Sequence, residues 1–420
     1  MPGGVGGSIS RVMSLDLASR RLSLDPRDPA FFNDPYRAYG RLHAHAPVLY
    51  WEQYGHWFFL GNADVNRLLR DRRFGREILH VATREELGLP EPAAHTRDFD
   101  AIDAHSMLER EPPAHTRLRT LVNRAFVSRQ VERLRPAIAA LAHALIDAFP
   151  AGEPFDLLEA YATPIPVRVI ARMLGVPEET APRLLDWSHR MVAMYAFGRT
   201  RAVEEDANAA ARDFAAFIRE TVAARRGAPG DDLLSVLIAA EEKGDRLSED
   251  ELVSTAILLL NAGHEATVHA LGNAVKTILE TGADPASMFA DAAATENAVE
   301  ECLRYDPPLH VFTRYVLEDL EESGIALKKG DRIGLVLGAT GRDPRVNPDP
   351  DRFDPARESP QHTAFGAGIH FCIGAPLARL EMQVALPILF ARCPSLRLAE
   401  PPRYRDAYHF HGLERLMVTT

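Results

Sequence analysis

The spacing of hydrophobic positions predicts a chain dominated by helices. From residue 128 to about residue 226, apolar side chains recur at helical spacing in alanine-rich runs. A second pattern, between residues 248 and 279, predicts one helix that begins at Ser248–Asp250 and extends about 45 Å at 1.5 Å per residue. A further helix is predicted from Thr295, as its N-cap, to Tyr305, because two prolines follow.

Shorter elements are predicted nearer the N-terminus. Alternating aromatic and β-branched residues at 48–51 and 56–60 predict a β-hairpin, between helices at 35–45 and 62–70, the second opened by an Asn or Asp cap. Residues 1–25 are glycine-rich and then mixed, which predicts a flexible segment. We therefore expect a mainly α fold with small β-sheets, and one domain over residues 26–420.

Two further stretches of the chain are irregular or short. Residues 75–112 mix Pro, His and Asp with short apolar pieces, and we weigh a substrate lid and an ordinary surface loop equally. The sequence Lys328–Asp331 predicts a tight turn, followed by a strand at 333–338.

Composition and charge narrow the class of protein. The 420 residues are 46% hydrophobic with a formal net charge of −11, which favours neither nucleic acid nor an anionic membrane as partner. The N-terminal segment lacks the apolar core of a signal peptide, and no apolar run approaches the roughly 20 residues of a membrane span. The three cysteines form no zinc or disulfide pattern and cannot alone hold an iron–sulfur cluster. We expect a cytoplasmic protein.

The most informative stretch is FGAGIHFCIGAPLAR, from Phe365 to Arg379. It places Cys372 in a glycine-rich loop just before an apolar, helix-compatible run from Pro376 to Phe390. Free N–H groups and the positive end of a helix dipole favour thiolate over thiol, and such a thiolate is a good axial ligand for haem iron. The alternative is a glycine-rich turn with a buried free cysteine.

This stretch resembles the haem-ligand signature of the cytochrome P-450 superfamily, the haem-thiolate monooxygenases. The matching positions are Phe365, Gly368, His370, Cys372, Gly374, Leu377, Ala378 and Arg379. The resemblance implies a single-domain fold that binds haem b, with Cys372 as the axial ligand of the iron and Phe365, Gly366, His370 and Gly374 around the cofactor. It also implies O2 as co-substrate.

Three further motifs support the same resemblance, and the first is HTRLR. His115 and Arg119 lie four residues apart, so they share one helix face and together can grip carboxylates. Taken alone, such a pair is usually a solvated face. In the resembled family this pair, with an arginine that matches Arg314, binds the haem propionates.

The second motif lies in the long predicted helix, at AGHEAT. Gly263 and the acid Glu265 interrupt an apolar stretch, which is compatible with a flat partner and a local π-bulge, or with a helix crossing and Glu265 reaching solvent. In the resembled family Ala262, Gly263 and Glu265 match the oxygen-activation motif. The usual threonine is Ala266 here. Thr267 follows it about 100° round the helix, so it should not simply replace the missing hydroxyl.

The third motif combines Glu301 and Arg304 with the later sequence PDRF. Three residues apart on a helix, the two charges alone would form a surface pair of little energetic value. The resemblance implies instead a buried structural ion pair completed by a later arginine, for which Arg352 is the candidate.

The resemblance implies insertion of one oxygen atom of O2 into an apolar small molecule, with Glu265, Ala266 and Thr267 at the catalytic position. Six residues are expected to face the substrate: Leu258, Asn261, Leu309, Val311, Phe312 and Phe410. The sequence does not identify the substrate. A peroxide-driven haem-thiolate enzyme, or a haem sensor or carrier without turnover, remain alternatives.

Electrons must come from another protein, because the chain has no cluster ligands and no flavin domain. We expect a ferredoxin with its NAD(P)H-dependent reductase. The expected docking residues are Arg72, Arg73, Arg119 and Arg379, a local basic patch on an acidic protein.

Overall fold

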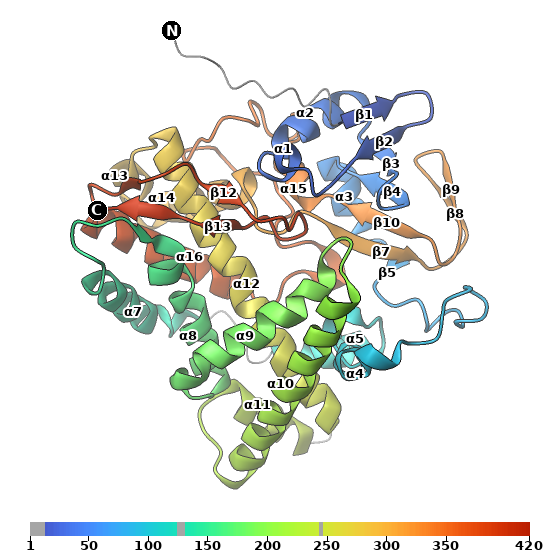
Figure 1. The fold of residues 1–420 in the computed structure, drawn as a ribbon, viewed down its shortest axis with the longest axis horizontal. Coiled ribbons are helices and arrows are strands. Elements are labelled where there is room, and N and C mark those ends of the chain that lie inside the picture. The colour runs from blue at the N-terminus through green and yellow to red at the C-terminus, as the bar shows by residue number, and fades with distance from the viewer. Residues whose placement is uncertain (1–12, 124–130, 243–246) are drawn as a thin grey trace. The chain divides into compact units, whose positions relative to one another are not determined.

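The computed structural model describes residues 13–123, 131–242 and 247–420, and its fold is mainly helical with small β-sheets (Figure 1). The chain separates into two compact units. Unit 1 contains residues 1–75, 273–371 and 400–416, and unit 2 contains residues 76–272, 372–399 and 417–420. Among the described residues, no helix is both long and apolar enough to cross a membrane.

Unit 1 carries most of the strands. Its strands are β1 (Met13–Asp16), β2 (Arg21–Leu24), β3 (Val48–Trp51), β4 (His56–Phe59), β5 (Phe74–Gly75), β7 (Phe312–Val316), β8 (Leu320–Glu322), β9 (Ile325–Leu327), β10 (Arg332–Leu335), β12 (Arg403–Tyr404) and β13 (Leu413–Arg415). Its helices are α1 (Pro29–Phe32), α2 (Tyr36–His45), α3 (Asn62–Leu68), α13 (Pro285–Met288), α14 (Ala292–Tyr305) and α15 (Leu337–Thr340), with a 3₁₀ turn at Gly368–His370.

A seven-stranded sheet in the order β1-β2-β3-β4-β10-β7-β5 organises unit 1. The predicted hairpin is confirmed, since β3 and β4 pair antiparallel with Val48 opposite Phe59. The prediction of a flexible segment over residues 1–25 is wrong from Met13 onward. There β1 and β2 extend the sheet and Leu22 and Leu24 are buried in its core, while residues 1–12 lie outside the described part.

Unit 2 carries most of the helices. They are α4 (Arg97–Asp103), α5 (Ala114–Asn123), α7 (Arg135–Asp147), α8 (Pro164–Leu174), α9 (Ala181–Val192), α10 (Arg201–Gly227), α11 (Leu233–Glu242), the greater part of α12 (Glu249–Thr281) and α16 (Ala375–Arg392). Short 3₁₀ turns lie at Ala94–Thr96, Met107–Glu109, Glu178–Thr180 and Ala193–Tyr195, and a π-helical turn lies at Leu158–Ala162. A small antiparallel sheet joins β11 (Arg397–Leu398), β14 (Met417–Thr419) and β6 (Phe155–Asp156).

The long helix α12 has the extent that the sequence predicts and begins with a capping box. The Ser248 hydroxyl accepts from the Glu251 N–H at 3.2 Å, and the Glu251 carboxylate accepts from the Ser248 N–H at 2.8 Å. The predicted π-bulge is absent from α12, all of which the structure describes, because its backbone is α-helical throughout.

Four other local predictions need correction. Helix α14 begins earlier than predicted, with Asp291 as N-cap in place of Thr295, because the aspartate carboxylate accepts from the Ala294 N–H. No side chain caps α3 from its N-cap position, Gly61; the carboxylate of Asp343 accepts the Asn62 N–H instead. The segment 75–112 contains the helix α4, and the strand predicted at 333–338 ends at Leu335.

Candidate functional site

Cys372 lies directly before α16, whose N-cap is Gly374. The thiol is half-buried, and the backbone N–H groups of Gly374 and Ala375 face it. Burial raises the pKa of the Cys372 thiol, and these N–H groups with the charges of Arg119 and Arg379 lower it less. The dipole and N–H contacts predicted from the sequence are therefore present, but burial outweighs them. A coordinated metal cation reverses this balance, because a ligating thiol is deprotonated.

The loop that precedes Cys372 in the chain belongs to unit 1 as far as Phe371. Gly366 and Gly368 have φ of +68° and +72°, a region that favours glycine. A Cβ on Gly368 would lie 2.3 Å from the carbonyl oxygen of Leu69, so no larger residue fits there. Phe365 and His370 lie in the same loop, and the motif residues are thus divided between the two units.

The predicted propionate ligands also lie in both units. In unit 2, His115 and Arg119 lie on α5; His115 is buried and Arg119 is half-buried. Burial lowers the pKa of Arg119, and the interaction with Cys372 opposes that shift. In unit 1, Arg314 is buried on β7 and its guanidinium lies 5.0 Å from the ring centroid of Phe312. Within each unit, these cationic or imidazole side chains are of the type that binds anionic groups.

One face of α12 is open although the residues around it are buried. Ala262 is exposed in the middle of this helix, and Leu258 and Ala266, four residues to either side, are partly exposed. By contrast, a Cβ on Gly263 would lie 2.8 Å from Ile170 of α8, which supports the helix-crossing interpretation of that glycine. The open face is therefore small and apolar, as a flat apolar ligand requires.

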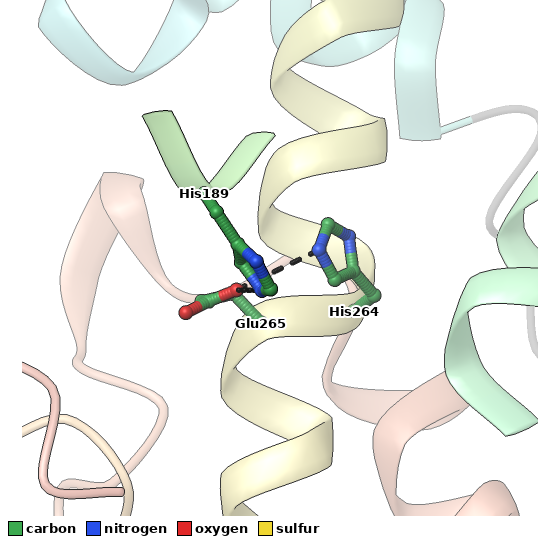
Figure 2. Close-up of side chains that lie close together, drawn as sticks. All are labelled: His189, His264 and Glu265. Atoms are coloured by element: carbon green, nitrogen blue, oxygen red, sulfur yellow. Dashed lines mark ion pairs between the residues drawn. The ribbon is translucent and has the colours of Figure 1, made fainter. Parts of the chain in front are cut away.

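Glu265 is surrounded by imidazoles and does not reach solvent. Its Oε2 lies 3.2 Å from Nε2 of His189 on α9 and 3.6 Å from Nε2 of His264, as Figure 2 shows, and its Oε1 lies 3.4 Å from Nε2 of His269. Burial by itself raises the pKa of this carboxyl, but the hydrogen bonds from His189 and His269 and the nearby imidazoles hold it well below the usual 4.5. Glu265 is thus an ionised acid in a buried position. The sequence prediction missed all three histidines.

Thr267 follows Ala266, the position at which the usual hydroxyl is missing. Its side chain is buried, and its Oγ1 donates back to the Gly263 carbonyl oxygen at 3.5 Å, the bond that a threonine in a helix makes when it has no other partner nearby. That Thr267 does not replace the hydroxyl missing at Ala266 stays a prediction.

Comparison with known proteins identifies the family. The Cytochrome P-450 family model matches residues 273–395. The biotin biosynthesis cytochrome P-450 of Bacillus subtilis is 35% identical over 392 residues, which cover 93% of this chain and 97% of that protein. The 6-deoxyerythronolide B hydroxylase of Saccharopolyspora erythraea is 37% identical, over 94% of this chain and 98% of its own.

The chain belongs to the cytochrome P-450 family.

Solved structures agree. A cytochrome P-450 in complex with an acyl carrier protein ligated to hexadec-9Z-enoic acid matches with a TM-score of 0.86 and 34% identity, over 94% of this chain and all of that one. An epothilone D-bound cytochrome P-450 matches with a TM-score of 0.86 and 29% identity, over 94% of this chain and 98% of that one. This P-450 is accordingly a monooxygenase that uses haem b and O2.

The residues of this P-450 fit a haem. The open apolar face of α12 is suited to a flat macrocycle, and the Cys372 thiol, which faces backbone N–H groups at a helix start, is suited to an iron ion. When bound, the haem supplies the reductive activation of O2. The protein supplies binding, orientation and electrostatics.

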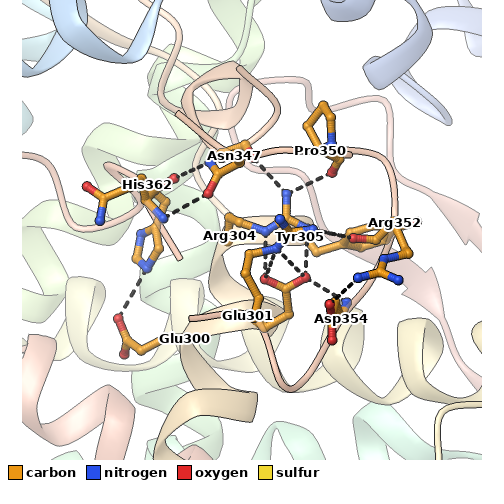
Figure 3. Close-up of polar contacts among 12 residues, drawn as sticks. Glu300, Glu301, Arg304, Tyr305, Asn347, Pro350, Arg352, Asp354 and His362 are labelled. Carbon is orange, nitrogen blue, oxygen red and sulfur yellow. Dashed lines mark hydrogen bonds and ion pairs between the residues drawn. The ribbon is translucent and has the colours of Figure 1, made fainter. Parts of the chain in front are cut away.

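The ion-pair network of this P-450 is buried in unit 1 and differs from the prediction in one partner. Arg304 donates to both carboxylate oxygens of Glu301, at 2.6 and 2.7 Å, and the side chains of both residues are fully buried. Its remaining N–H groups donate to the backbone carbonyl of Gly341 and to those of Pro350 and Arg352, and Figure 3 shows the last two. All five donors of Arg304 are thereby used.

The prediction that Arg352 is the third charged partner is wrong. Its side chain is 67% exposed and pairs with Asp354, and it contributes only its carbonyl to Arg304. The second cation at Glu301 is Arg357, whose Nε lies 3.2 Å from Glu301 Oε2. Arg357 lies five residues after Arg352 in a segment without helix or strand. The sequence therefore does not indicate which of the two side chains points toward Glu301.

Two of the predicted substrate-facing residues lie together in unit 1. Leu309 and Phe410 form an isolated antiparallel β-bridge, and the His310 N–H donates to the His409 carbonyl oxygen at 3.1 Å. Val311, by contrast, is buried in the core beneath the large sheet, so its predicted place in the pocket is not supported.

Of the residues predicted for partner docking, Arg72 and Arg73 are exposed in unit 1, and Arg119 and Arg379 are half-buried in unit 2. Arg73 pairs with Asp71 at 2.6 Å, which reduces its free positive charge. Docking at these residues stays a prediction.

Proposed function

We propose that this cytochrome P-450 hydroxylates an apolar small molecule, with Cys372 as the axial ligand of the haem iron and a separate protein as electron donor. The observation that carries the proposal is the open face of α12. Ala262 is exposed and Leu258 and Ala266, one turn to either side, are apolar and partly exposed, while the ionised acid Glu265 is buried on the same helix. An apolar surface beside a carboxylate that is fixed by neighbouring imidazoles suits a reaction that needs a water-free substrate site and a supply of protons.

The chain's own residues then have separate tasks. His115, Arg119 and Arg314 bind the haem carboxylates, and the loop from Phe365 to Gly374 packs against the cofactor beside Cys372. Glu265 moves protons, because its lowered pKa keeps the carboxyl ionised at neutral pH and a proton taken up from a donor is released again readily. Leu309, Phe312 and Phe410 contact the substrate, with Asn261 at the edge of the open α12 face.

The electron donor is a ferredoxin with its NAD(P)H-dependent reductase. The chain's net charge is −11, so docking of an acidic ferredoxin needs a local basic surface, and Arg72, Arg73, Arg119 and Arg379 supply the candidate charges. Such an interaction weakens with salt, because exposed charges are screened over about 10 Å at 0.1 M ionic strength.

The assignment of Cys372 is tested by the absorption spectrum of the dithionite-reduced protein with carbon monoxide. The expected result is a strongly red-shifted Soret band in the wild-type protein and in Cys393→Ser, a control at another cysteine of unit 2. Cys372→Ser should lose the red-shifted band. A red-shifted band in Cys372→Ser would remove Cys372 from the role of axial ligand.

A peroxide-driven enzyme is the second candidate, and one observation favours it. Ala266 carries no hydroxyl, and the Thr267 hydroxyl is directed to the helix backbone. The two candidates are separated by turnover of one substrate, first with ferredoxin, reductase and NAD(P)H, then with hydrogen peroxide alone. A donor-dependent P-450 is faster in the first assay. Faster turnover with peroxide, and no gain from ferredoxin, would overturn the first proposal.

The Ala266→Thr variant tests whether a substrate hydroxyl replaces the missing threonine. If it does, the added side chain competes with the substrate and lowers coupled product formation, by about tenfold for one displaced proton-bearing contact. The measurement is product formed per NAD(P)H consumed. A variant that is faster and better coupled than wild type would argue against assistance by the substrate.

A further inference from the structure

Three metal-binding side chains converge beside α12 in unit 2: His189, His264 and Glu265 (Figure 2). Each offers one ligand atom, and these three atoms all lie within 4.8 Å of one another. We propose that they form a binding site for a divalent transition-metal ion, of which Zn²⁺ is the physiological candidate. The site is separate from the haem iron and its thiolate ligand.

The distances suit a tetrahedral ion. Zn²⁺ binds imidazole nitrogen at about 2.0–2.1 Å and carboxylate oxygen at about 2.0–2.2 Å, which places neighbouring ligand atoms of a tetrahedron roughly 3.4 Å apart. Glu265 Oε2 lies 3.2 Å from His189 Nε2 and 3.6 Å from His264 Nε2, on either side of that value. Small side-chain rotations therefore bring all three atoms to an ion, with the fourth position left for water.

The tautomer of His264 points to a cation. Its Nδ1 lies 2.7 Å from the Leu260 carbonyl oxygen, which can only accept, so Nδ1 carries the proton. In the neutral ring Nε2 then presents a bare lone pair. This atom is buried, has no hydrogen-bond partner among the described residues, and lies 3.6 Å from a carboxylate oxygen that is also an acceptor. Two acceptors that face each other in a buried place are stabilised by a cation between them.

The surroundings of the three ligands resemble those of built metal sites. The carbonyl that holds His264 Nδ1–H is the kind of outer partner that fixes the tautomer and orientation of a metal-bound imidazole. His269 Nε2 lies 3.4 Å from the other oxygen of Glu265 and so orients the carboxylate. His189, on α9, is 45% exposed, so an ion can reach the buried pair from solvent through this residue.

The donor set selects the class of metal. Two imidazoles and one carboxylate suit Zn²⁺, Cu²⁺ or Ni²⁺, whereas Ca²⁺ and Mg²⁺ take oxygen ligands almost exclusively. The sequence HEATVH places its histidines five apart, so they do not make the i, i+4 pair of a zinc protease helix. The second imidazole is that of His189, which comes from another helix, α9. No local sequence motif therefore predicts the site.

Occupation of the site would affect turnover, and this consequence rests on the proposed function of Glu265 as a proton carrier. A carboxylate bound to Zn²⁺ has lost a basic oxygen to the metal, so it no longer passes protons. We expect Zn²⁺ to divert electrons from product to reduced oxygen species. Metal binding itself does not depend on that role.

Binding is tested on the haem-loaded full chain after metal removal, by competition for Zn²⁺ with a chromophoric chelator. The matched control is His143→Asn, which removes an exposed histidine of α7 in the same unit. Wild type and this control should each bind one tight Zn²⁺ that excess Mg²⁺ does not displace. His189→Asn should lower the Zn²⁺ affinity of that site by at least about tenfold. Loss of a residue that only hydrogen-bonds to a metal ligand already costs about that much, and His189 is a direct ligand. His189 is half-exposed, so this variant is expected to fold, and an unchanged carbon monoxide spectrum verifies it.

Two results would overturn the site: no tight Zn²⁺ in the wild-type protein, or equal affinity in wild type and His189→Asn, which would mean adventitious binding to other histidines. A separate assay measures product per NAD(P)H with and without Zn²⁺. Binding without any change in coupling would leave the metal site intact and contradict proton transfer by Glu265. Loss of coupling in wild type but not in His189→Asn would support both.

Discussion

Glu301 and Glu265 are both buried carboxylates on helices, and they differ in the basic side chains that surround them. Glu301 accepts two hydrogen bonds from Arg304 and lies 3.2 Å from Arg357. Glu265 has three imidazoles within 3.6 Å. A guanidinium keeps its proton at any physiological pH, whereas an imidazole gains and loses one near neutrality. Glu301 is therefore paired with permanently charged side chains, whereas the partners of Glu265 are of a kind that can carry or lack a proton.

This difference in partners shows that the chain uses one buried carboxylate for stability and another for chemistry. Arg304 uses every donor in a fixed geometry and ties α14 to the chain around Gly341 and Arg352, so the network holds unit 1 together. At Glu265 the contacts are longer and one partner, His189, is half-exposed. Such an acid is held in place but remains connected to solvent, which suits a proton carrier or a metal ligand.

The largest effect is expected from breaking the fixed pair. Arg304→Ala leaves the Glu301 carboxylate buried and short of its main partner, which should cost about 3–5 kcal/mol of unfolding free energy. The measurement is urea unfolding of the purified protein, together with the fraction that retains haem. We expect poor haem retention at 37 °C.

Arg352→Ala is the matched control, because the same motif contains it but its charge does not touch Glu301. With a side chain 67% exposed, it should change the unfolding free energy by less than about 0.5 kcal/mol. Equal destabilisation by the two substitutions would contradict the assignment of Arg352 to a backbone role and restore the sequence prediction.

The second effect is expected on chemistry rather than on stability. Glu265→Gln keeps the size of the side chain but removes its negative charge and its capacity to carry a proton. We expect product formed per NAD(P)H to fall by about 100-fold, or roughly 2.7 kcal/mol, while haem content stays normal. The assay follows product and NAD(P)H consumption together.

Glu280→Gln provides the comparison for this variant, since Glu280 lies near the C-terminal end of α12 and its side chain is 41% exposed. It should leave coupling unchanged. If Glu265→Gln is as well coupled as Glu280→Gln, Glu265 is a structural residue like Glu301 and the contrast between the two acids disappears.

Glu301 and Glu265 also show which contacts can be predicted from the sequence and which cannot. The pair Glu301–Arg304 follows from helical spacing and from the motif, and its burial is confirmed. The remaining partner was misassigned because Arg352 and Arg357 both lie in irregular chain after α14, where no periodicity indicates which side chain turns inward. Local charge patterns predict contacts along one helix better than contacts between a helix and a loop.

At Glu265 the position was predicted and the surroundings were not. His269 could have been found, because a buried acid needs a partner and this residue lies one turn later on the same helix. His189 could not, since it lies on α9 and nothing in its local sequence distinguishes it from a surface histidine. The burial of Cys372 behaves in the same way: its dipole and N–H contacts are local and predictable, whereas the burial that raises its pKa comes from the whole fold.

The smallest effect is expected from a third buried acid, Glu381 on α16, which extends the comparison to a carboxyl that has no cationic partner among the described residues. Its side chain is fully buried, neither oxygen has a hydrogen-bond partner among the described residues, and burial raises its pKa well above the usual 4.5. The folded protein therefore keeps this proton where the unfolded chain has lost it. As the pH rises from about 4.5 toward the raised pKa, the stability contributed by Glu381 falls, by at most about 1.4 kcal/mol per pH unit for a single proton.

Glu381→Gln does not titrate at this position. Its unfolding free energy, measured by urea titration at each pH, should therefore decline less steeply than that of the wild-type protein between pH 6 and pH 8. Parallel curves for the two proteins would contradict a proton held on Glu381 in the folded state.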